Sequence, residues 1–455
     1  MKKILVLALI CLLAGCSNGS SRKGNPAPES VSTSSEAEES AATSDGEEAL
    51  PTEESQAFPT AAPSENSELY DLFMKQWKTG DVTRFYSYAS DQIKSILDEN
   101  EFQYMFCGNF STFGQIKEVK NEKIDKAGST EVHSGTLVLE NVKIDYELTL
   151  RQGEIAGYFN NLRIVNPFEV KKEHGVTEYY SLLQSGDYLL NAVYVKAAQE
   201  DAPVAILIPG SGPNDYNEST GILTPFQDLA EDLAAKGISS LRFEKRTLRY
   251  GSNWLNTYGL EEEYFQDLES AYNWLTNVNG SKNVWLLGHS LGVNIAAEFS
   301  NRHPVEGMIL WNGSARHLAE IAADQLAAQA PVTSEYYHAL AENAKAVTAE
   351  TSDGHSYFNC SDYYWATYNA LDTISSIRKA GIPTLIINSR NDKQTFDQDI
   401  ELWQSAFAND GKVTLRVFDD LSHFGYKIDG STASFYQFQE FPGELTDEIV
   451  SFIKK

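Results

Sequence analysis

Cysteine and positive charge are both scarce in this sequence of 455 residues. The four cysteines are too few for a disulfide framework, and no Cys-x-x-Cys pair is present that could hold zinc. Only 36 lysines and arginines oppose 64 aspartates and glutamates, so the formal net charge is −28. This balance disfavours binding to nucleic acid and docking on anionic lipid through basic patches. Long apolar runs are also missing: beyond the N-terminus, no segment is apolar for long enough to be a transmembrane helix.

The N-terminus has the pattern of an export signal. Lys2 and Lys3 precede the apolar run 4–13, which is too short to span a bilayer permanently. Residues 13–16, Leu-Ala-Gly-Cys, resemble the bacterial lipobox, in which the cysteine receives lipid and becomes the new N-terminus. We therefore expect residues 1–16 to be a lipoprotein signal peptide, with Cys16 lipidated by fatty acids such as palmitate. The alternative is a plain cleaved signal in which Cys16 is incidental.

Residues 17–68 have the composition of a solvated tether. They are rich in Ser, Ala, Pro, Thr and Glu, and two basic residues stand against eleven acids. Low hydrophobicity combined with like charge cannot offset the entropy lost on ordering. We predict a disordered acidic spacer that holds the folded part away from the membrane surface.

Residues 69–165 predict a small α+β domain. Tyr70, Phe73, Met74 and Trp77 recur at helical spacing, whereas later segments alternate as strands do, at 131–139, 142–150 and 153–159. The stretch 77–86 resembles a cone-shaped family like that of nuclear transport factor 2. No cluster of acids, histidines and cysteines here forms a recognisable site, so we expect a spacer or recognition module.

From about residue 170 to residue 455, predicted strands and helices alternate. Alternation of this kind is typical of an α/β fold with a mostly parallel sheet and crossover helices. Residues 288–292 are a Gly-x-Ser-x-Gly motif between a predicted buried strand and a predicted helix. This is the context of a nucleophile elbow, a strained turn that raises its serine to the edge of the sheet. Ser290 is therefore the predicted nucleophile.

Two candidate partners for Ser290 follow later strands. Asp392 lies just past the strand predicted at 383–388, and His423 lies past the strand predicted at 413–418. In a triad, His423 would take the hydroxyl proton, and Asp392 would fix its tautomer and stabilise the imidazolium.

Other residues compete for these roles. Asp397 and Asp399 are rivals for the acid, since both lie at the start of the following helix, where acids also serve as caps. His289 neighbours the nucleophile, but the elbow is expected to point it away, into a packing role.

The chain order of serine, acid and histidine is that of the α/β hydrolases. Residues 209–213, Pro-Gly-Ser-Gly-Pro, resemble a turn in the serine aminopeptidase-like or esterase-like branch of that family. Family members often continue x-Asp-Arg-Asp, and the Arg-Asp part is replaced here by Tyr216 and Asn217. The resemblance implies that the backbone N–H of Ser211 acts with that of Leu291 as the oxyanion hole, with Gly212 as the alternative to Ser211.

The resemblance also implies an α/β-hydrolase domain over 170–455, doubly wound, with a helical lid at about 313–380. Residues 242–249 are similar to a family stretch, Arg-Tyr-Asp-Lys-Arg-Gly-x-Gly, but have lost its glycines. We interpret Glu244, Lys245 and Arg246 as a structural ion-pair cluster. Between Cys107 and Cys360 we expect two unpaired thiols rather than a disulfide.

Together these features predict a lipid-anchored serine hydrolase on the outer side of the cell membrane. Its expected substrate is a small-molecule carboxylic ester, cleaved through an acyl-enzyme without a metal or organic cofactor. Two alternatives stay open at this stage: a serine peptidase or amidase of the same fold, and a noncatalytic cell-surface binding protein. Neither the oligomeric state nor the acyl and alcohol specificity follows from the sequence.

Overall fold

The structure, a computed structural model, describes residues 65–250, 258–351 and 354–455. The predicted signal peptide with Cys16 and nearly all of the predicted tether lie outside these residues. Helix α2 (Asn66–Trp77) begins before Glu68, so the last residues assigned to the tether are helical instead. Glu68 lies in the first turn, where a negative charge is favourable beside the positive end of the helix dipole. Within the described ranges, no helix combines the length and apolar character that a membrane crossing requires.

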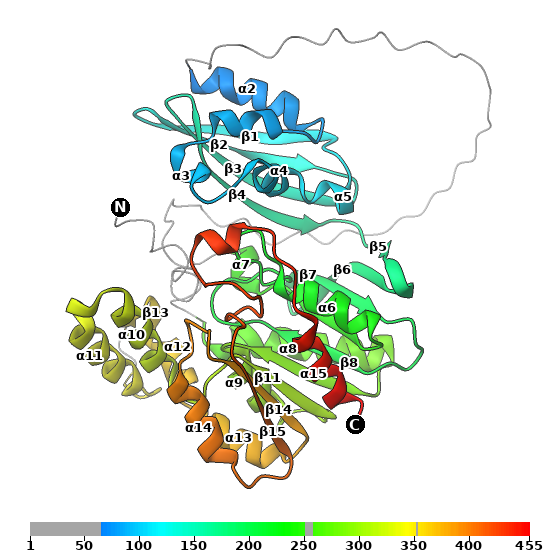
Figure 1. Cartoon of the computed structure of the whole chain (residues 1–455), viewed down its shortest axis with the longest axis vertical. Helices are drawn as coiled ribbons and strands as arrows, with labels where there is room; N and C mark the ends of the chain where they lie inside the picture. Colours follow the sequence, from blue (N-terminus) through cyan, green and yellow to red (C-terminus); the bar gives the residue numbers. More distant parts are fainter. Residues whose placement is uncertain (1–64, 251–257, 352–353) are drawn as a thin grey trace.

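The first unit packs short helices against a four-stranded antiparallel sheet (Figure 1). Its core is aromatic: the ring of Phe106 meets those of Phe73 and Trp77 edge-on. Besides α2, its elements are η1 (Thr83–Tyr88), α3 (Asp91–Lys94), α4 (Glu99–Cys107), α5 (Phe110–Phe113), β1 (Glu118–Ala127), β2 (Thr130–Val138), β3 (Val142–Arg151) and β4 (Glu154–Ile164).

The second unit is built on a nine-stranded sheet with the order β15-β14-β11-β10-β8-β9-β7-β6-β5. The strands from β15 to β9 run parallel, and β7, β6 and β5 continue the sheet antiparallel. This confirms the predicted α/β fold class with a mostly parallel sheet. The strands are β5 (Phe168–Lys171), β6 (Thr177–Ser185), β7 (Tyr188–Lys196), β8 (Val204–Ile208), β9 (Ser239–Phe243), β10 (Val284–His289), β11 (Gly307–Trp311), β14 (Thr384–Ser389) and β15 (Val413–Phe418).

Helices cover both faces of this sheet because its strands are apolar on both faces. On β8, Leu207 packs with α6 and α15, whereas Ile206 packs with α8 and α9 on the other side. The helical segments of these layers and loops are η2 (Glu173–Gly175), α6 (Pro225–Ala235), α7 (Arg246–Tyr250), η4 (Glu261–Phe265), α8 (Gln266–Asn273), η5 (Trp274–Asn279), α9 (Gly292–Phe299), α13 (Thr373–Ala380), α14 (Asp397–Phe407), η7 (Ala433–Tyr436) and α15 (Gly443–Ile453).

The interval 313–380, predicted as a lid, divides into two parts. Its first elements form the helical group at the side of the sheet in Figure 1: α10 (Leu318–Gln329), η6 (Pro331–Thr333), α11 (Ser334–Lys345), β12 (Ser356–Tyr357), β13 (Cys360–Ser361) and α12 (Asp362–Tyr368). The last helix, α13, instead joins the layer of α9, where Thr373 accepts a hydrogen bond from Asn294. Helix α13 is thus a crossover helix that leads into β14.

Asn191 on β7 joins the two units. Its side-chain carbonyl accepts the N–H of Ile164 at 2.8 Å, and its side-chain amide donates to the carbonyl of Leu162 at 2.7 Å. A second contact involves the loop that follows β15: the ring of Phe438 packs edge-on against that of Tyr104. The small unit therefore contacts both the antiparallel part of the large sheet and its C-terminal loop.

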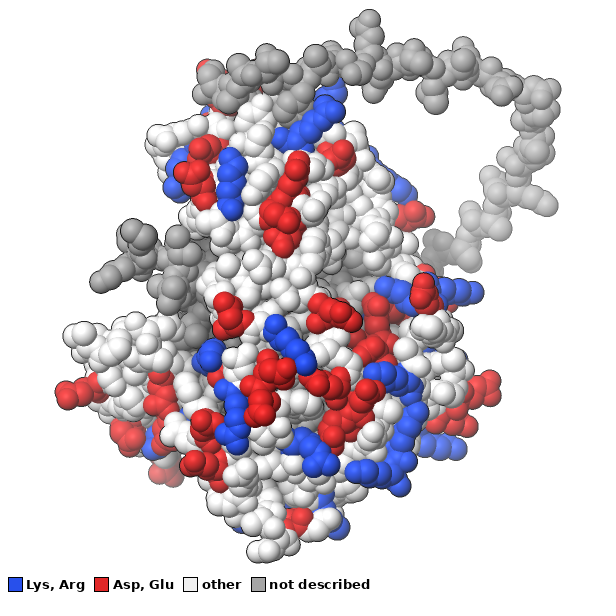
Figure 2. All heavy atoms as spheres, viewed as in Figure 1, with Lys and Arg blue, Asp and Glu red and all other residues white. Residues whose placement is uncertain are grey.

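The strand order positions the site. Strand β8 is followed along the chain by β9 on one side of it, and β10 lies on its other side, so the order reverses between β8 and β10. In open α/β sheets, ligands bind at the carboxyl ends of the strands at such a reversal. On the face drawn in Figure 2, acidic and basic side chains are intermixed over this unit, and the lysines and arginines do not gather into one patch.

Candidate active site

Ser290 occupies a sharp turn between β10 and α9. Its backbone φ is 54°, a left-handed conformation that a residue with a side chain rarely adopts. The turn is tight on both sides, because a β-carbon at Gly288 would lie 2.2 Å from the carbonyl oxygen of Gly292, and one at Gly292 would lie 2.2 Å from that of Ile208. The half-buried Ser290 is thereby lifted to the carboxyl end of the sheet, as an elbow requires.

Asp392 and His423 are hydrogen-bonded to each other. The distance from His423 Nδ1 to Asp392 Oδ2 is 2.7 Å, and both side chains are buried. Asp392 also accepts the N–H groups of Gln394 and Thr395, at 2.6 and 3.0 Å. Burial alone would raise the pKa of Asp392, but the charge of His423 and these hydrogen bonds hold it below its ordinary value. Asp392 is therefore a carboxylate that orients the ring of His423.

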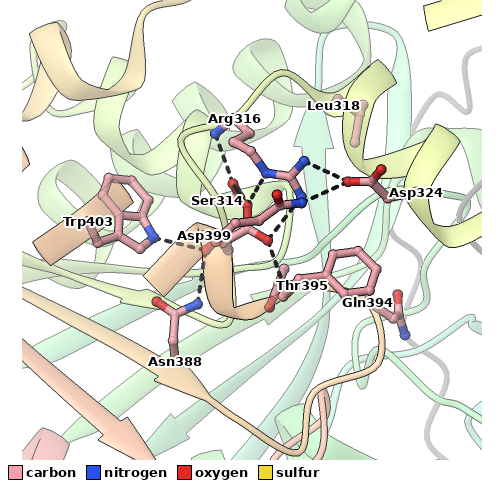
Figure 3. Close-up of polar contacts among 12 residues, drawn as sticks. Ser314, Arg316, Leu318, Asp324, Asn388, Gln394, Thr395, Asp399 and Trp403 are labelled. Atoms are coloured by element: carbon pink, nitrogen blue, oxygen red, sulfur yellow. Dashed lines mark hydrogen bonds and ion pairs between the residues drawn. The ribbon is translucent and has the colours of Figure 1, made fainter. Parts of the chain in front are cut away.

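The two rival acids have other partners. Asp397 is exposed and pairs with Arg390 at 2.9 Å. Asp399 is fully buried and receives the side chain of Arg316, with 2.6 Å between Nε and Oδ1. Figure 3 shows Arg316 reaching from Asp399 to Asp324 on α10. Arg316 thus ties the helical group to the start of α14, and Asp399 is engaged there rather than with His423.

His289 is buried and packs against Trp311, with 4.4 Å between the ring centroids. We expected a packing role that points away from the nucleophile. The sequence did not indicate that its Nε2 would lie 2.8 Å from the carbonyl oxygen of His423, with 4.7 Å between the two ring centroids. Its Nδ1 lies 2.9 Å from Oε2 of Glu218, and both residues are buried. The other oxygen of Glu218 accepts the N–H of Gly210 at 2.7 Å. No local pattern could have found this pair, since the two residues are 71 positions apart.

Both nitrogens of His289 face oxygen atoms, and a neutral imidazole carries a hydrogen on only one of its nitrogens. Together, Glu218 and His289 must therefore hold one proton more than a carboxylate and a neutral imidazole have. Burial alone would lower the pKa of His289, but the charge of Glu218 and hydrogen bonds to Glu218 and to the His423 carbonyl raise it above its ordinary value. The raised pKa favours the charged form of His289 beside Glu218.

The turn predicted to supply an oxyanion donor lies against the nucleophile. A β-carbon at Gly210 would be 2.9 Å from Cβ of Ser290 and 3.4 Å from its Oγ. Ser211 follows in this turn, and Leu291 caps the N-terminus of α9. In the part of the chain that the structure describes, the N–H groups of Ser211 and Leu291 donate to no protein acceptor.

The charged residues that follow β9 form ion pairs. Lys245 pairs with Glu263, Arg246 pairs with Asp267, and Glu244 pairs with Arg249. Across the described ranges, no group of three or more His, Cys, Asp or Glu side chains is placed to hold a metal ion. The expectation that no metal or cofactor is needed stays a prediction.

No protein-family model matches the chain. It is 25% identical to the esterase EstD of Thermotoga maritima over 365 residues. This alignment covers 79% of this chain and 88% of EstD. The solved structure of Est1E from Butyrivibrio proteoclasticus covers 61% of this chain and 99% of its own, with a TM-score of 0.42 and 14% identity. A structure of the Pyrococcus furiosus esterase Pf2001 covers 64% of this chain and 91% of its own, with a TM-score of 0.39 and 15% identity.

Sheet order, helix layers and the serine elbow together define an α/β-hydrolase fold. The sequence similarity to EstD supports the α/β-hydrolase family for this chain and is consistent with a hydrolase that acts on esters.

The Glu218–His289 pair predicts a particular pH dependence of stability. Because the pKa of His289 is raised on folding, its stabilisation is complete below the unfolded-state pKa of about 6.5 and is lost as the pH rises through the folded-state pKa. Glu218→Gln removes the charge but can keep both hydrogen bonds, to Gly210 and to a neutral His289. We expect the melting temperature of the variant to lie below that of the unmodified protein at pH 6, with the gap closing toward pH 9.

Glu269→Gln is the matched control, since Glu269 also pairs with a histidine, His303, but is only half-buried. That variant should show no comparable pH-dependent gap. A gap for Glu218→Gln that stays constant from pH 6 to pH 9 would contradict the charged pair.

Proposed function

We propose that the protein is a serine hydrolase that cleaves carboxylic esters by acyl transfer through Ser290, His423 and Asp392. The observation that carries this proposal is the buried hydrogen bond between Asp392 and His423. The ring of His423 lies 4.7 Å from that of His289, the residue that precedes the strained Ser290. Asp392 occupies Nδ1 of His423 and leaves Nε2 as the nitrogen that can exchange a proton with the serine. A packing role for these residues would require neither a left-handed serine at the end of β10 nor a buried histidine–carboxylate pair.

The reaction follows from these positions. Ser290 Oγ attacks the ester carbonyl carbon while His423 Nε2 takes its proton, and the carbonyl oxygen becomes an oxyanion between the N–H groups of Ser211 and Leu291. When the tetrahedral intermediate collapses, His423 returns the proton to the leaving alcohol, and an acyl-enzyme remains. Water, deprotonated by His423, then attacks the acyl carbon and releases the carboxylic acid and the free serine. In each half-reaction His423 takes up one proton and gives it away again, to the alcohol in the first and to Ser290 in the second. The histidine is therefore regenerated without a cofactor.

An ester is favoured over an amide as the substrate because the curated relative of the chain is an esterase, aligned along most of both sequences. The cellular location belongs to the same proposal. We infer lipid attachment at Cys16 on the outer face of the cell membrane, with the residues between Cys16 and α2 as the spacer and the small α+β unit as a spacer or recognition module.

Ser290→Ala should lower the hydrolysis of p-nitrophenyl acetate by at least about 10³-fold, because only binding and the oxyanion hole remain. The same variant should lose covalent labelling by a fluorophosphonate. Ser300→Ala is a suitable control, since Ser300 lies at the other end of α9 and its hydroxyl donates to the helix carbonyl of Ala297. Unchanged hydrolysis by Ser290→Ala would refute the proposed function.

Asp392→Asn should lower kcat by about 10³–10⁴-fold, because an amide at this position favours the wrong tautomer of His423. Asp397→Asn, in the exposed rival, should leave kcat within twofold of the unmodified enzyme. Steady-state kinetics on a soluble ester measures both. Equal losses in the two variants would show that Asp392 does not have the role assigned to it.

Cys16→Ser should abolish the incorporation of radiolabelled palmitate into the full-length chain expressed in a bacterial host. Cys11→Ser, which changes a cysteine inside the predicted apolar run, should leave labelling intact. Palmitate labelling that persists in Cys16→Ser would contradict lipidation at this residue.

A further inference from the structure

The carbonyl oxygen of Gly210 is held by an unusual number of donors. The hydroxyl of Tyr264 donates to it at 2.5 Å, the side-chain amide of Asn214 at 3.1 Å and the ammonium of Lys245 at 3.3 Å. These donors come from three separate segments of the chain. A carbonyl oxygen has two lone pairs, so three donors leave this one little freedom to turn.

Lys245 is buried at a position where a charge is costly. Its side chain is 1% exposed, its ammonium lies 2.8 Å from Oε1 of Glu263, and it also lies 3.9 Å above the ring of Tyr264. A buried ion pair is often no more stable than a pair of apolar side chains of the same size. Stability alone therefore does not account for an ammonium at this position. Its contact with the Gly210 carbonyl does account for it, because an apolar side chain could not donate to that oxygen.

The orientation of that carbonyl fixes the next amide. In a trans peptide, the C=O of Gly210 and the N–H of Ser211 point in opposite directions, and the described residues include no cis peptide. With its oxygen held toward Lys245 and Tyr264, the peptide directs the Ser211 N–H away from them. The N–H of Gly210 itself is bound to Glu218, so it cannot serve as an oxyanion donor.

This peptide borders the nucleophile, as the 2.9 Å approach of a Gly210 β-carbon to Cβ of Ser290 shows. We propose that Lys245 and Tyr264 are positioning residues, which hold and polarise the Gly210–Ser211 peptide so that the Ser211 N–H faces the developing oxyanion. The proposal rests on the proposed ester hydrolysis. Donors at the carbonyl end of an amide draw electron density from its N–H and strengthen it as a donor, and a fixed donor needs no reorganisation as charge develops.

We call the contacts of Lys245 and Tyr264 with the Gly210 carbonyl the clamp. Tyr264→Phe tests the clamp by removing one hydroxyl. We expect kcat for p-nitrophenyl acetate to fall by about three- to tenfold, the loss typical of one hydrogen bond, with KM changed less than twofold. The affinity for an alkyl trifluoromethyl ketone, which adds to a serine as a hemiketal oxyanion, should fall by the same factor as kcat/KM.

Tyr272→Phe is the matched control. Tyr272 lies on the following helix and donates to a backbone carbonyl, that of Pro304, at 2.8 Å. Its variant should keep both kcat and the affinity for the ketone. The double variant Lys245→Met/Glu263→Met removes the ammonium without leaving its partner charged and buried. It should reproduce the kcat pattern of Tyr264→Phe with a larger loss, in protein whose circular dichroism spectrum is unchanged.

Two results would overturn the clamp: equal kcat and ketone affinity in Tyr264→Phe and Tyr272→Phe, or a loss confined to KM. Either result, obtained while Ser290→Ala still abolishes hydrolysis, would refute the clamp and leave the proposed function standing. Ester hydrolysis that persists in Ser290→Ala would instead refute the function on which the clamp rests.

Discussion

The hydrogen bond between the Gly210 N–H and Glu218 is the contact on which the candidate site depends. The second oxygen of the same carboxylate holds His289, and His289 holds the carbonyl of His423. One buried side chain therefore connects the turn after β8, the strand that ends at Ser290, and the loop of the proposed base. Since a buried carboxylate has lost its water, leaving any of these partners unpaired is costly, and the three segments keep one mutual arrangement. The positions of nucleophile, base and oxyanion turn are thus set by contacts behind the site rather than within it.

Positive charge lies against the next peptide unit along the chain. Glu218 accepts the N–H of Gly210, which belongs to the Pro209–Gly210 peptide, whereas Lys245 donates to the Gly210 carbonyl, which belongs to the Gly210–Ser211 peptide. Each charge therefore lies at the favourable end of its own peptide dipole. The stretch 242–246 supplies further buried charges, and Arg242 pairs with Glu178 at 2.8 Å. These pairs contribute little net stability when burial is counted against attraction. These pairs instead fix the positions of the side chains, because a paired charge in a low dielectric tolerates only small displacements.

The sequence predicted features whose signal is local and missed those that depend on the fold. The elbow was predictable because two glycines and a serine at fixed spacing occur between an apolar strand and a helix. Asp392 and His423 were predictable because each follows a strand. Strands β6 and β7 were not predicted, although Gly186 and Asp187 between two alternating runs are typical of a hairpin. Strand β1 has mostly exposed side chains and lacks the apolar alternation that would reveal it. The partnership of Glu218 with His289 could not be predicted, because it arises only when the sheet brings two loops together.

The departure from the family turn at Tyr216 and Asn217 can be placed in the structure. Asn217 accepts a hydrogen bond from Arg242 Nε at 3.0 Å. The adjoining Asp215 accepts the N–H groups of Asn217 and Ser219, so it stabilises its own loop. Residues 215–219 are therefore anchored among themselves and on β9, whereas the first half of the turn lies against Ser290. Asn214 joins the halves, since its amide donates to the carbonyls of both Gly210 and Ser211. A change in the second half therefore alters the contacts of residues 215–219, whereas the Gly210–Ser211 peptide keeps its own hydrogen bonds. For this reason the oxyanion turn can be retained when the rest of the motif is not.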